Sequence, residues 1–516
     1  MMLPDALRKN QVALILGTFV LMGGVLRFLP GWLAGFPIND GGMFLVMIRD
    51  LQTNRFILPL VVSYNLSGIP FAYPPFGFYL AAALSDWLSI PPIDLLLWLP
   101  PLVSAAIIPA FYWLARQIFN SEPKAMVATA LYAFMPGVSD WLIMGGGLTR
   151  AFGILFSLLA VGFVHRVFRG GEKRSIIPAI LFCTFAALSH PEAGLQTAAI
   201  CLVLWAFDGR SLSGTKNAAL IAGGVTALTA PWWLTVLRDH GLAPFESAIQ
   251  TGVRETLFAS LFHSIFSLQG GLPILPTFSL VGIFAVSRRR EFPLVVWAFA
   301  PFFVDPRNAP AIAIFPILML ASEGAYFLNA EFVRAHSKTF HTHTEGTSFP
   351  LRLSVAIFTA LLLYLFLVSW RGASNLARVS LTPADRETME WVRQNTPVES
   401  RFLLFTNTGQ VSLMADAYQE WFPALAKRNS RSTLQGLEWM LGPEFFSYSQ
   451  RLSALQSCQT ADCLFDWMRK EGGEANYLVF KKQGASPLLM DSLRAQDGYQ
   501  VVYDSENALI LLLVNP

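Results

Sequence analysis

Five ionisable side chains lie beside long apolar stretches, where an unpaired charge is costly: Asp40, Asp140, Arg150, His190 and Glu192. A carboxylate in such a place can take a proton from a hydroxyl group. An arginine close to the start of a helix is suited to hold a phosphate. These residue types therefore predict chemistry on a phosphate-carrying substrate that is held in the membrane.

Asp40 lies in the segment FPINDGGMFLVMIRDL, just before a predicted amphipathic helix. One interpretation is that its carboxylate caps that helix, because Asp accepts hydrogen bonds from the free N–H groups of a first turn. The other is catalysis, and the two roles are compatible. Gly41 and Gly42 would leave room for a ligand to approach the backbone.

The other two segments also allow two interpretations. In GVSDWLIMGGGLTRAF, Asp140 closes one predicted span and Arg150 opens the next, so they form part of a site, a structural Asp–Arg pair, or an interfacial anchor. In LSHPEAG, His190 and Glu192 lie at the end of a helical hairpin, as site residues or as a capped kink at Pro191.

The elements that position these residues are predicted to be membrane helices. Of the 516 residues, 54% are hydrophobic and 14% are charged, against about 25% charged in soluble proteins, and mean hydropathy is +0.48. This composition excludes an ordinary cytosolic enzyme, a disordered chain and a nucleic-acid binder. Four cysteines exclude a disulfide-rich scaffold.

A membrane-spanning helix needs about 20 apolar residues. Eleven predicted spans make up a membrane body, residues 1–370: 11–29, 93–115, 125–144, 150–168, 176–190, 193–207, 217–237, 272–287, 291–304, 309–328 and 353–370. The apolar stretch 75–88 is short, and we expect it to be a re-entrant or interfacial helix within a long loop, residues 30–92.

The distribution of Lys and Arg predicts the orientation of the membrane body. With the N-terminus in the cytoplasm, the inner loops carry 16 basic residues and the outer loops carry 6. Eleven spans then place the C-terminal domain on the extracytoplasmic side. Counting 75–88 as a further span would move the basic cluster 166–174 outside and break the rule.

Residues 381–516 are predicted to form an extracytoplasmic α/β domain with net charge −4, whereas residues 1–380 carry +7. Its pattern predicts a helix over 384–395 and buried strands over 401–406, 477–480 and 508–514. Cys458 and Cys463 lie five residues apart and are expected to form a local disulfide.

The remaining cysteines and histidines have plainer interpretations. Cys183 and Cys201 lie within spans and are expected to be packing residues. His341 and His343 are possible metal ligands, although a solvated loop fits their segment better.

The order of these segments resembles the GT-C superfamily of polyprenyl-phosphate-sugar glycosyltransferases over roughly residues 10–330. The resemblance rests on the early Asp40, on GIPFAYPPFGFYLAAAL (68–84) and on FYWLARQIFNSEPKAMVATALYAFMPG (111–137). The last two look closest to an uncharacterised branch labelled 6-pyruvoyl-tetrahydropterin synthase-related membrane proteins. The soluble synthase of that name uses a zinc-binding His triad, and none is found in this sequence.

The resemblance implies that Asp40 is the catalytic base or an acceptor-orienting residue and that Asp140 is a second acid. It implies that Arg150 binds the donor phosphate. Many members carry Asp-Glu in the first loop, whereas here Gly41 follows Asp40, which argues against a protein mannosyltransferase.

The expected reaction inverts the anomeric centre of a lipid-linked sugar, with His190 helping Arg150. A hydroxyl acceptor requires no metal, whereas an amide acceptor would have Asp40 and Asp140 hold a divalent cation. The acceptor is a glycan, a lipid or a protein, and nucleic acid is not expected. The rival interpretations are a transporter or flippase and an inactive scaffold; polar residues gathered at the outer span ends, without internal repeats, favour the transferase.

Overall fold

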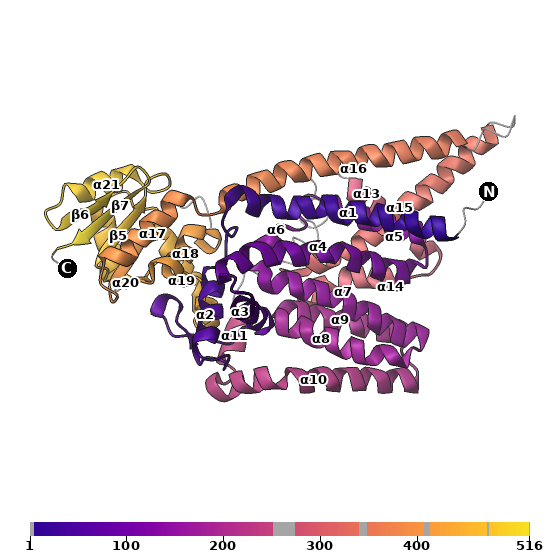
Figure 1. The fold of residues 1–516 in the computed structure, drawn as a ribbon, viewed down its shortest axis with the longest axis horizontal. Helices are drawn as coiled ribbons and strands as arrows, with labels where there is room; N and C mark the ends of the chain where they lie inside the picture. The colour runs from indigo at the N-terminus through magenta and orange to yellow at the C-terminus, as the bar shows by residue number, and fades with distance from the viewer. Residues whose placement is uncertain (1–4, 251–273, 340–347, 407–412, 472–473, 515–516) are drawn as a thin grey trace.

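The structure is a computed structural model that describes residues 5–250, 274–339, 348–406, 413–471 and 474–514. The possible metal ligands His341 and His343 lie outside these residues. Figure 1 shows a bundle of long helices with a smaller α/β domain at one of its ends. Helix α1 begins at the opposite end of the bundle.

Ten of the eleven predicted spans fall mainly on a helix of the bundle, because runs of apolar residues can satisfy their backbone groups in lipid only within a helix. Among the described residues, six helices are long and apolar enough to cross a membrane: α1, α4, α7, α10, α15 and α16. The helices of the bundle are α1 (Asp5–Ala34), α4 (Pro92–Phe119), α5 (Glu122–Phe134), α7 (Gly147–Gly170), α8 (Ile176–Ser189), α9 (Pro191–Asp208), α10 (Leu212–His240), α13 (Ile274–Arg288), α14 (Pro293–Val304), α15 (Ala309–Thr339) and α16 (Ser348–Leu376).

The predicted span 125–144 is wrong in its second half, because α5 ends at Phe134. Met135 is extended, as expected for a residue that precedes a proline, and Gly137 has φ +76°. The chain turns there and starts the short helix α6 (Asp140–Ile143). Asp140 therefore begins a new helix at the end of the bundle and does not close a span.

The long loop between α1 and α4 is ordered and compact. It contains α2 (Gly42–Thr53), a two-stranded ribbon of β1 (Val61–Val62) and β2 (Ile69–Pro70), and α3 (Phe76–Leu88). The 13 residues of α3 match the expected short helix and are too few to cross a bilayer as a helix. Figure 1 places α2 and α3 between the bundle and the C-terminal domain.

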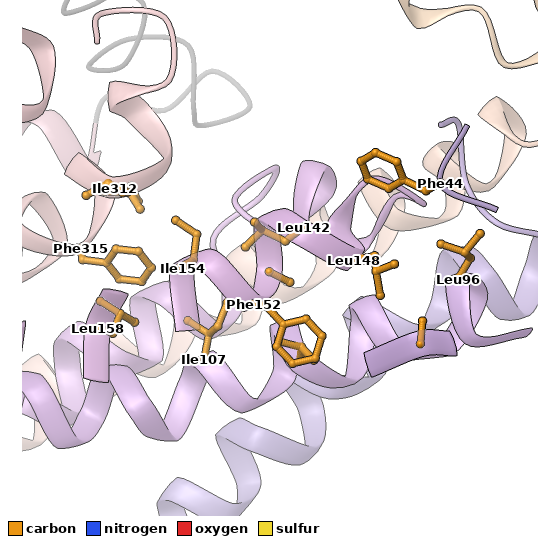
Figure 2. Close-up of a cluster of buried hydrophobic side chains, with 14 of the residues drawn as sticks. Phe44, Leu96, Ile107, Leu142, Leu148, Phe152, Ile154, Leu158, Ile312 and Phe315 are labelled. Carbon is orange, nitrogen blue, oxygen red and sulfur yellow. The ribbon is translucent and has the colours of Figure 1, made fainter. Parts of the chain in front are cut away.

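A continuous apolar core joins the helices of the bundle. Figure 2 shows part of it as a row of side chains that runs from Leu96 and Leu148 to Leu158 and Phe315. These four residues are at most 3% exposed. The core positions the N-terminal end of α7, which carries the Arg150 side chain.

One buried cation lies inside the first span. Arg27 is 1% exposed. Its Nε donates to Ser104 Oγ at 3.1 Å, and its Nη1 donates to the carbonyl oxygens of Gly23 at 2.8 Å and Ala133 at 3.2 Å. Arg27 thus joins α1 to α4 and to the end of α5. The comparison of basic residues in inner and outer loops does not include Arg27, because it lies within a span.

The C-terminal domain is built on a five-stranded mixed sheet with strand order β4-β3-β5-β7-β6. Strands β3 and β4 are parallel, as are β3 and β5, whereas β7 runs antiparallel to β5 and β6. The elements are α17 (Pro383–Asn395), β3 (Arg401–Phe405), α18 (Ala417–Ala426), β4 (Asn429–Ser430), α19 (Phe445–Gln456), α20 (Ala461–Glu471), β5 (Tyr477–Lys481), α21 (Pro487–Arg494), β6 (Tyr499–Asp504) and β7 (Ala508–Leu513).

The predicted helix and three predicted strands of this domain are confirmed, because their apolar or helical patterns are local and strong. Strand β6 was not predicted, since all of its side chains are exposed or half-buried and give no apolar run. Cys458 and Cys463 are joined by a disulfide. The domain packs on the long loop, where the Phe36 and Trp421 rings lie 4.7 Å apart.

Candidate active site

An ion pair between Asp40 and Arg150 lies where the long loop meets the start of α7. Asp40 is 7% exposed. Its Oδ2 accepts a hydrogen bond from Arg150 Nη1 at 3.1 Å, and its Oδ1 accepts one from the Gly146 N–H at 2.7 Å. The Arg150 guanidinium also lies over the Trp141 ring, 5.2 Å from its centroid. Two residues that are 110 positions apart in sequence thus form one charged unit.

The capping interpretation of Asp40 is wrong for the helix that follows it. The N-cap residue of α2 is Gly41, with φ +124°, and no side chain of its own segment caps the helix. The free N–H groups of Gly41 and Gly42 instead donate to Glu420 Oε1, at 2.7 and 3.0 Å. Asp40 is therefore left to face the start of α7.

The glycines around Asp40 admit the protein's own backbone rather than a ligand. A Cβ at Gly145 would lie 1.9 Å from the Asp40 carbonyl oxygen, and one at Gly146 would lie 2.4 Å from Asp40 Oδ2. A Cβ at Gly42 would lie 2.5 Å from the carbonyl oxygen of Glu420. The glycine run before α7 is thus required for the long loop to reach Arg150.

Some N–H groups of Arg150 have no hydrogen-bond partner among the described residues. Its Nη1 serves Asp40 and, at 3.5 Å, the carbonyl oxygen of Trp141. Within the part of the chain that the structure describes, its Nε and Nη2 donate to no protein atom, and the side chain is 31% exposed. A guanidinium has five N–H donors in a fork that matches a phosphate. Arg150 can therefore hold Asp40 and an anion at the same time.

His190, Glu192 and Tyr73 extend the site along α7. His190 Nδ1 lies 3.7 Å from Glu192 Oε2. The Tyr73 hydroxyl is 3.3 Å from Thr149 Oγ1, and the Tyr73 ring lies 6.1 Å from the His190 ring. Arg150 interacts electrostatically with both Tyr73 and Glu192. Four of the predicted site residues are thus brought together, with the unpredicted Tyr73 between them.

Asp140 makes no ion pair with Arg150 among the described residues, so the alternative of a structural Asp140–Arg150 pair is wrong. Arg150 forms its ion pair with Asp40, since the long loop folds over the start of α7. The neighbouring residue Trp141 contacts Arg150, so the Asp140 backbone lies within about 10 Å of the guanidinium, given the roughly 3.8 Å spacing of consecutive Cα atoms. Burial raises the pKa of Asp140.

The C-terminal domain supplies two acids that the sequence analysis missed, Glu420 and Glu438. Burial raises the pKa of each, and the negative charge of Asp40 raises that of Glu420 further. Glu438 interacts with Arg307, which also interacts with Glu192. The one available signal was the placement of Glu420 between aromatic residues in AYQEWF, which is unusual for a solvated helix. Nothing in the sequence joins that segment to the first loop.

The described residues fit a resident metal ion poorly. Among them, no group of three or more His, Cys, Asp or Glu side chains is arranged to hold one. Both oxygens of Asp40 already accept N–H donors, one of them from a cation. The residues of this site are therefore better suited to bind an anion beside Arg150 than a cation beside Asp40.

Comparison with known proteins defines the class of this fold. Residues 72–302 match the family described as 6-pyruvoyl-tetrahydropterin synthase related domain, membrane protein. No curated protein sequence matches the chain. The predicted resemblance of this segment is thus confirmed: residues 72–302 are similar to a family of membrane proteins.

Solved glycosyltransferases share the architecture over most of the chain. The archaeal oligosaccharyltransferase AglB from Archaeoglobus fulgidus, in complex with an inhibitory peptide and a dolichol-phosphate, superposes with TM-score 0.62 at 14% identity, over 92% of this chain and 70% of that one. ArnT from Cupriavidus metallidurans bound to undecaprenyl phosphate gives 0.56 at 13% identity, over 97% and 98%. Arabinofuranosyltransferase AftD from Mycobacteria gives 0.55 at 13%, over 98% and 40%.

At these identities the likeness concerns the fold alone. The predicted fold class is confirmed in outline: the protein is a helical membrane protein with a C-terminal domain built on a β-sheet, and its fold is similar to that of these glycosyltransferases.

Proposed function

We propose that this protein is a membrane glycosyltransferase that moves a sugar from a polyprenyl-phosphate donor to a hydroxyl group of an acceptor. The observation that carries the proposal is the Asp40–Arg150 unit, in which a carboxylate that can accept a proton is held by a guanidinium whose Nε and Nη2 donate to no atom of the described residues. This unit lies at a helix start, at the end of a GT-C-like membrane body.

In the proposed reaction, Asp40 takes the proton of the acceptor hydroxyl while that oxygen attacks the anomeric carbon. Each carboxylate oxygen of Asp40 accepts one hydrogen bond from the protein, which leaves a further lone pair for the acceptor. The bond between the anomeric carbon and the phosphate oxygen breaks, and polyprenyl phosphate leaves with the electron pair. Attack from the side opposite the phosphate inverts the anomeric centre.

Arg150 stabilises the departing phosphate through Nε and Nη2. His190 and Arg307 add polar and positive groups on the same side, since both interact with the cluster around Glu192. Two proteins with a similar fold were solved in complex with a dolichol-phosphate and with undecaprenyl phosphate, which supports a polyprenyl-phosphate donor here. The acceptor is a glycan, a lipid or a protein.

The reaction with a hydroxyl acceptor requires no metal cofactor. An amide acceptor is a poorer nucleophile, and for it Asp40 and Asp140 would share a divalent cation. Addition of a chelator to the purified protein separates the two cases, because only the second loses activity.

We further propose that transfer takes place at the extracytoplasmic face. The site and the C-terminal domain lie at one end of the bundle, and α1 begins at the other (Figure 1), which agrees with a cytoplasmic N-terminus and 16 basic residues in the inner loops. Reporters fused after Pro516 test this orientation. Activity of a reporter that works only in the cytoplasm would contradict it.

The proposed activity is tested in proteoliposomes that contain the purified protein and polyprenyl-phosphate donors with a range of labelled sugars. We expect release of the sugar or its transfer to an added acceptor, above the level of protein-free liposomes. If no sugar is turned over, the proposal fails and a scaffold role is favoured. Movement of intact donor across the bilayer would instead indicate a flippase.

A further inference from the structure

Glu420 reaches from the C-terminal domain into the first loop of the membrane body. It lies on α18 and is 6% exposed. Its Oε1 accepts hydrogen bonds from two successive backbone N–H groups, those of Gly41 and Gly42. These are the residues that directly follow Asp40 in the chain.

The two N–H groups need an acceptor because they lie at the start of α2. The first N–H groups of a helix have no partner within it, and Gly41, the N-cap residue, has no side chain to offer one. The positive end of the helix dipole also favours a carboxyl group at this place. Glu420, which is 379 positions from Gly41 in sequence, thus supplies the cap that the local sequence lacks.

Contacts from the same segment hold the chain on the other side of Asp40. Trp421 Nε1 donates to the carbonyl oxygen of Asn39 at 2.8 Å. The carbonyl oxygen of Glu420 accepts from the Tyr64 hydroxyl at 2.6 Å and lies where a Cβ of Gly42 would clash. Residues 39, 41 and 42 are therefore fixed by two adjacent residues of α18, and Asp40 is the residue between them.

We propose that Glu420 is a positioning residue for Asp40, whose carboxyl group sets the backbone so that the Asp40 carboxylate meets Arg150 and the acceptor. The inference rests on the proposed function and deepens it, since it makes the C-terminal domain a part of the catalytic unit. A displacement of about 1 Å at a reacting group can cost roughly 100-fold in rate.

This role requires an acceptor oxygen and not a negative charge. Burial and the nearby Asp40 carboxylate raise the pKa of Glu420, which favours its neutral form. The carbonyl oxygen of a neutral carboxyl group, or of a glutamine amide, can still accept both N–H donors. Positioning therefore predicts that glutamine replaces Glu420 with little loss, whereas proton transfer by Glu420 predicts that it cannot.

The test compares Glu420→Ala and Glu420→Gln with the wild type, with Glu390→Ala as a control at an exposed acid on α17. We expect Glu420→Ala to lower kcat by about 10- to 100-fold with KM for the lipid donor nearly unchanged, and Glu420→Gln to stay within about threefold. Hydrogen–deuterium exchange of the peptide 36–45 should be faster in Glu420→Ala only. Wild-type kcat in Glu420→Ala, or equal losses in both variants, would overturn the proposal.

Two further arms keep the test decisive. If Glu420→Ala is not recovered from membranes, Gly42→Ala replaces it, because alanine favours a helix and its Cβ would push the Glu420 backbone away; unchanged kcat in this variant would also overturn the proposal. If the wild type turns over no donor, the proposed function has failed. The hydrogen–deuterium exchange measurement then decides by itself whether Glu420 positions the first loop. Unchanged exchange of peptide 36–45 in Glu420→Ala would then refute positioning.

Discussion

Two buried carboxylates at opposite ends of the bundle are paired with cations in different ways. Glu323, on α15, is 5% exposed. Its Oε1 lies 2.8 Å from Lys124 Nζ, and its Oε2 lies 2.8 Å from Arg289 Nη2. Asp40 is buried to a similar degree, but it shares a single cation, Arg150, and takes its other hydrogen bond from a backbone amide.

The difference lies in what each group leaves unused. At Glu323, each carboxylate oxygen binds a different cation, Lys124 or Arg289. These contacts hold α5 and the end of α13 against α15. At Asp40, the one guanidinium keeps two nitrogens free of protein partners among the described residues and is partly exposed. A closed ion group stabilises the fold, whereas an open one can bind a ligand. The predictions below test this distinction.

The largest effect is expected for Asp40→Asn, which keeps an oxygen for the Gly146 N–H but removes the proton acceptor. Loss of a general base typically costs 10²–10⁴-fold in rate. The measurement is donor turnover in proteoliposomes, normalised to protein recovered in the membrane. Full activity of the variant would remove Asp40 as the base and make its pair with Arg150 merely structural.

A smaller effect is expected for Arg150→Lys, which keeps the positive charge but not the forked donors. One ammonium group cannot hold Asp40 and a phosphate with the same geometry. We expect kcat/KM to fall by about 10- to 100-fold, or about 1.4 to 2.7 kcal/mol. Binding of a polyprenyl phosphate without sugar should weaken as well, and unchanged binding would show that the free nitrogens of Arg150 hold no phosphate.

At the opposite end, Glu323→Gln should change stability and leave chemistry alone. It leaves Lys124 and Arg289 without their shared counter-ion, and we expect a loss of about 1–3 kcal/mol, below the value for fully buried pairs because Arg289 is 41% exposed. Thermal unfolding in detergent measures this loss. A fall in turnover per folded molecule as large as that of Asp40→Asn would break the comparison.

The smallest effect concerns pH and the Glu420 contact. The pKa of Glu420 is raised in the folded protein, whereas in an unfolded chain a Glu titrates near about 4.3. Above that pH the unfolded chain has lost a proton that the folded protein keeps, so stability falls as pH rises toward the raised pKa. We expect the Tm of the wild type, relative to Glu420→Gln, to drop by a few degrees between about pH 5 and pH 8. A relative rise would contradict the raised pKa.

The sequence by itself determined the membrane body, the end of the chain that folds as an α/β domain, and the segments that carry the charges. Apolar runs and helical or strand periodicity are local properties, so α1, α4, α7, β3, β5 and β7 lie where they were predicted. The end of α5 just before Pro136 could also have been predicted from the sequence, because a proline disfavours helix at the residue before it. The apolar residues on both sides of Pro136 led to the prediction of one continuous span.

The tertiary structure alone decided which charges meet. Asp40 and Arg150 are 110 residues apart, and Gly41 and Glu420 are 379 apart. No periodicity links such positions, because a long loop and a separate domain must both fold onto the start of α7. Asp140 is ten residues from Arg150 and was the more obvious partner in sequence. Side chains at the glycines before α7 would clash with Asp40. Because these positions are glycines, Asp40 can reach Arg150 and pair with it, although Asp140 is nearer in sequence.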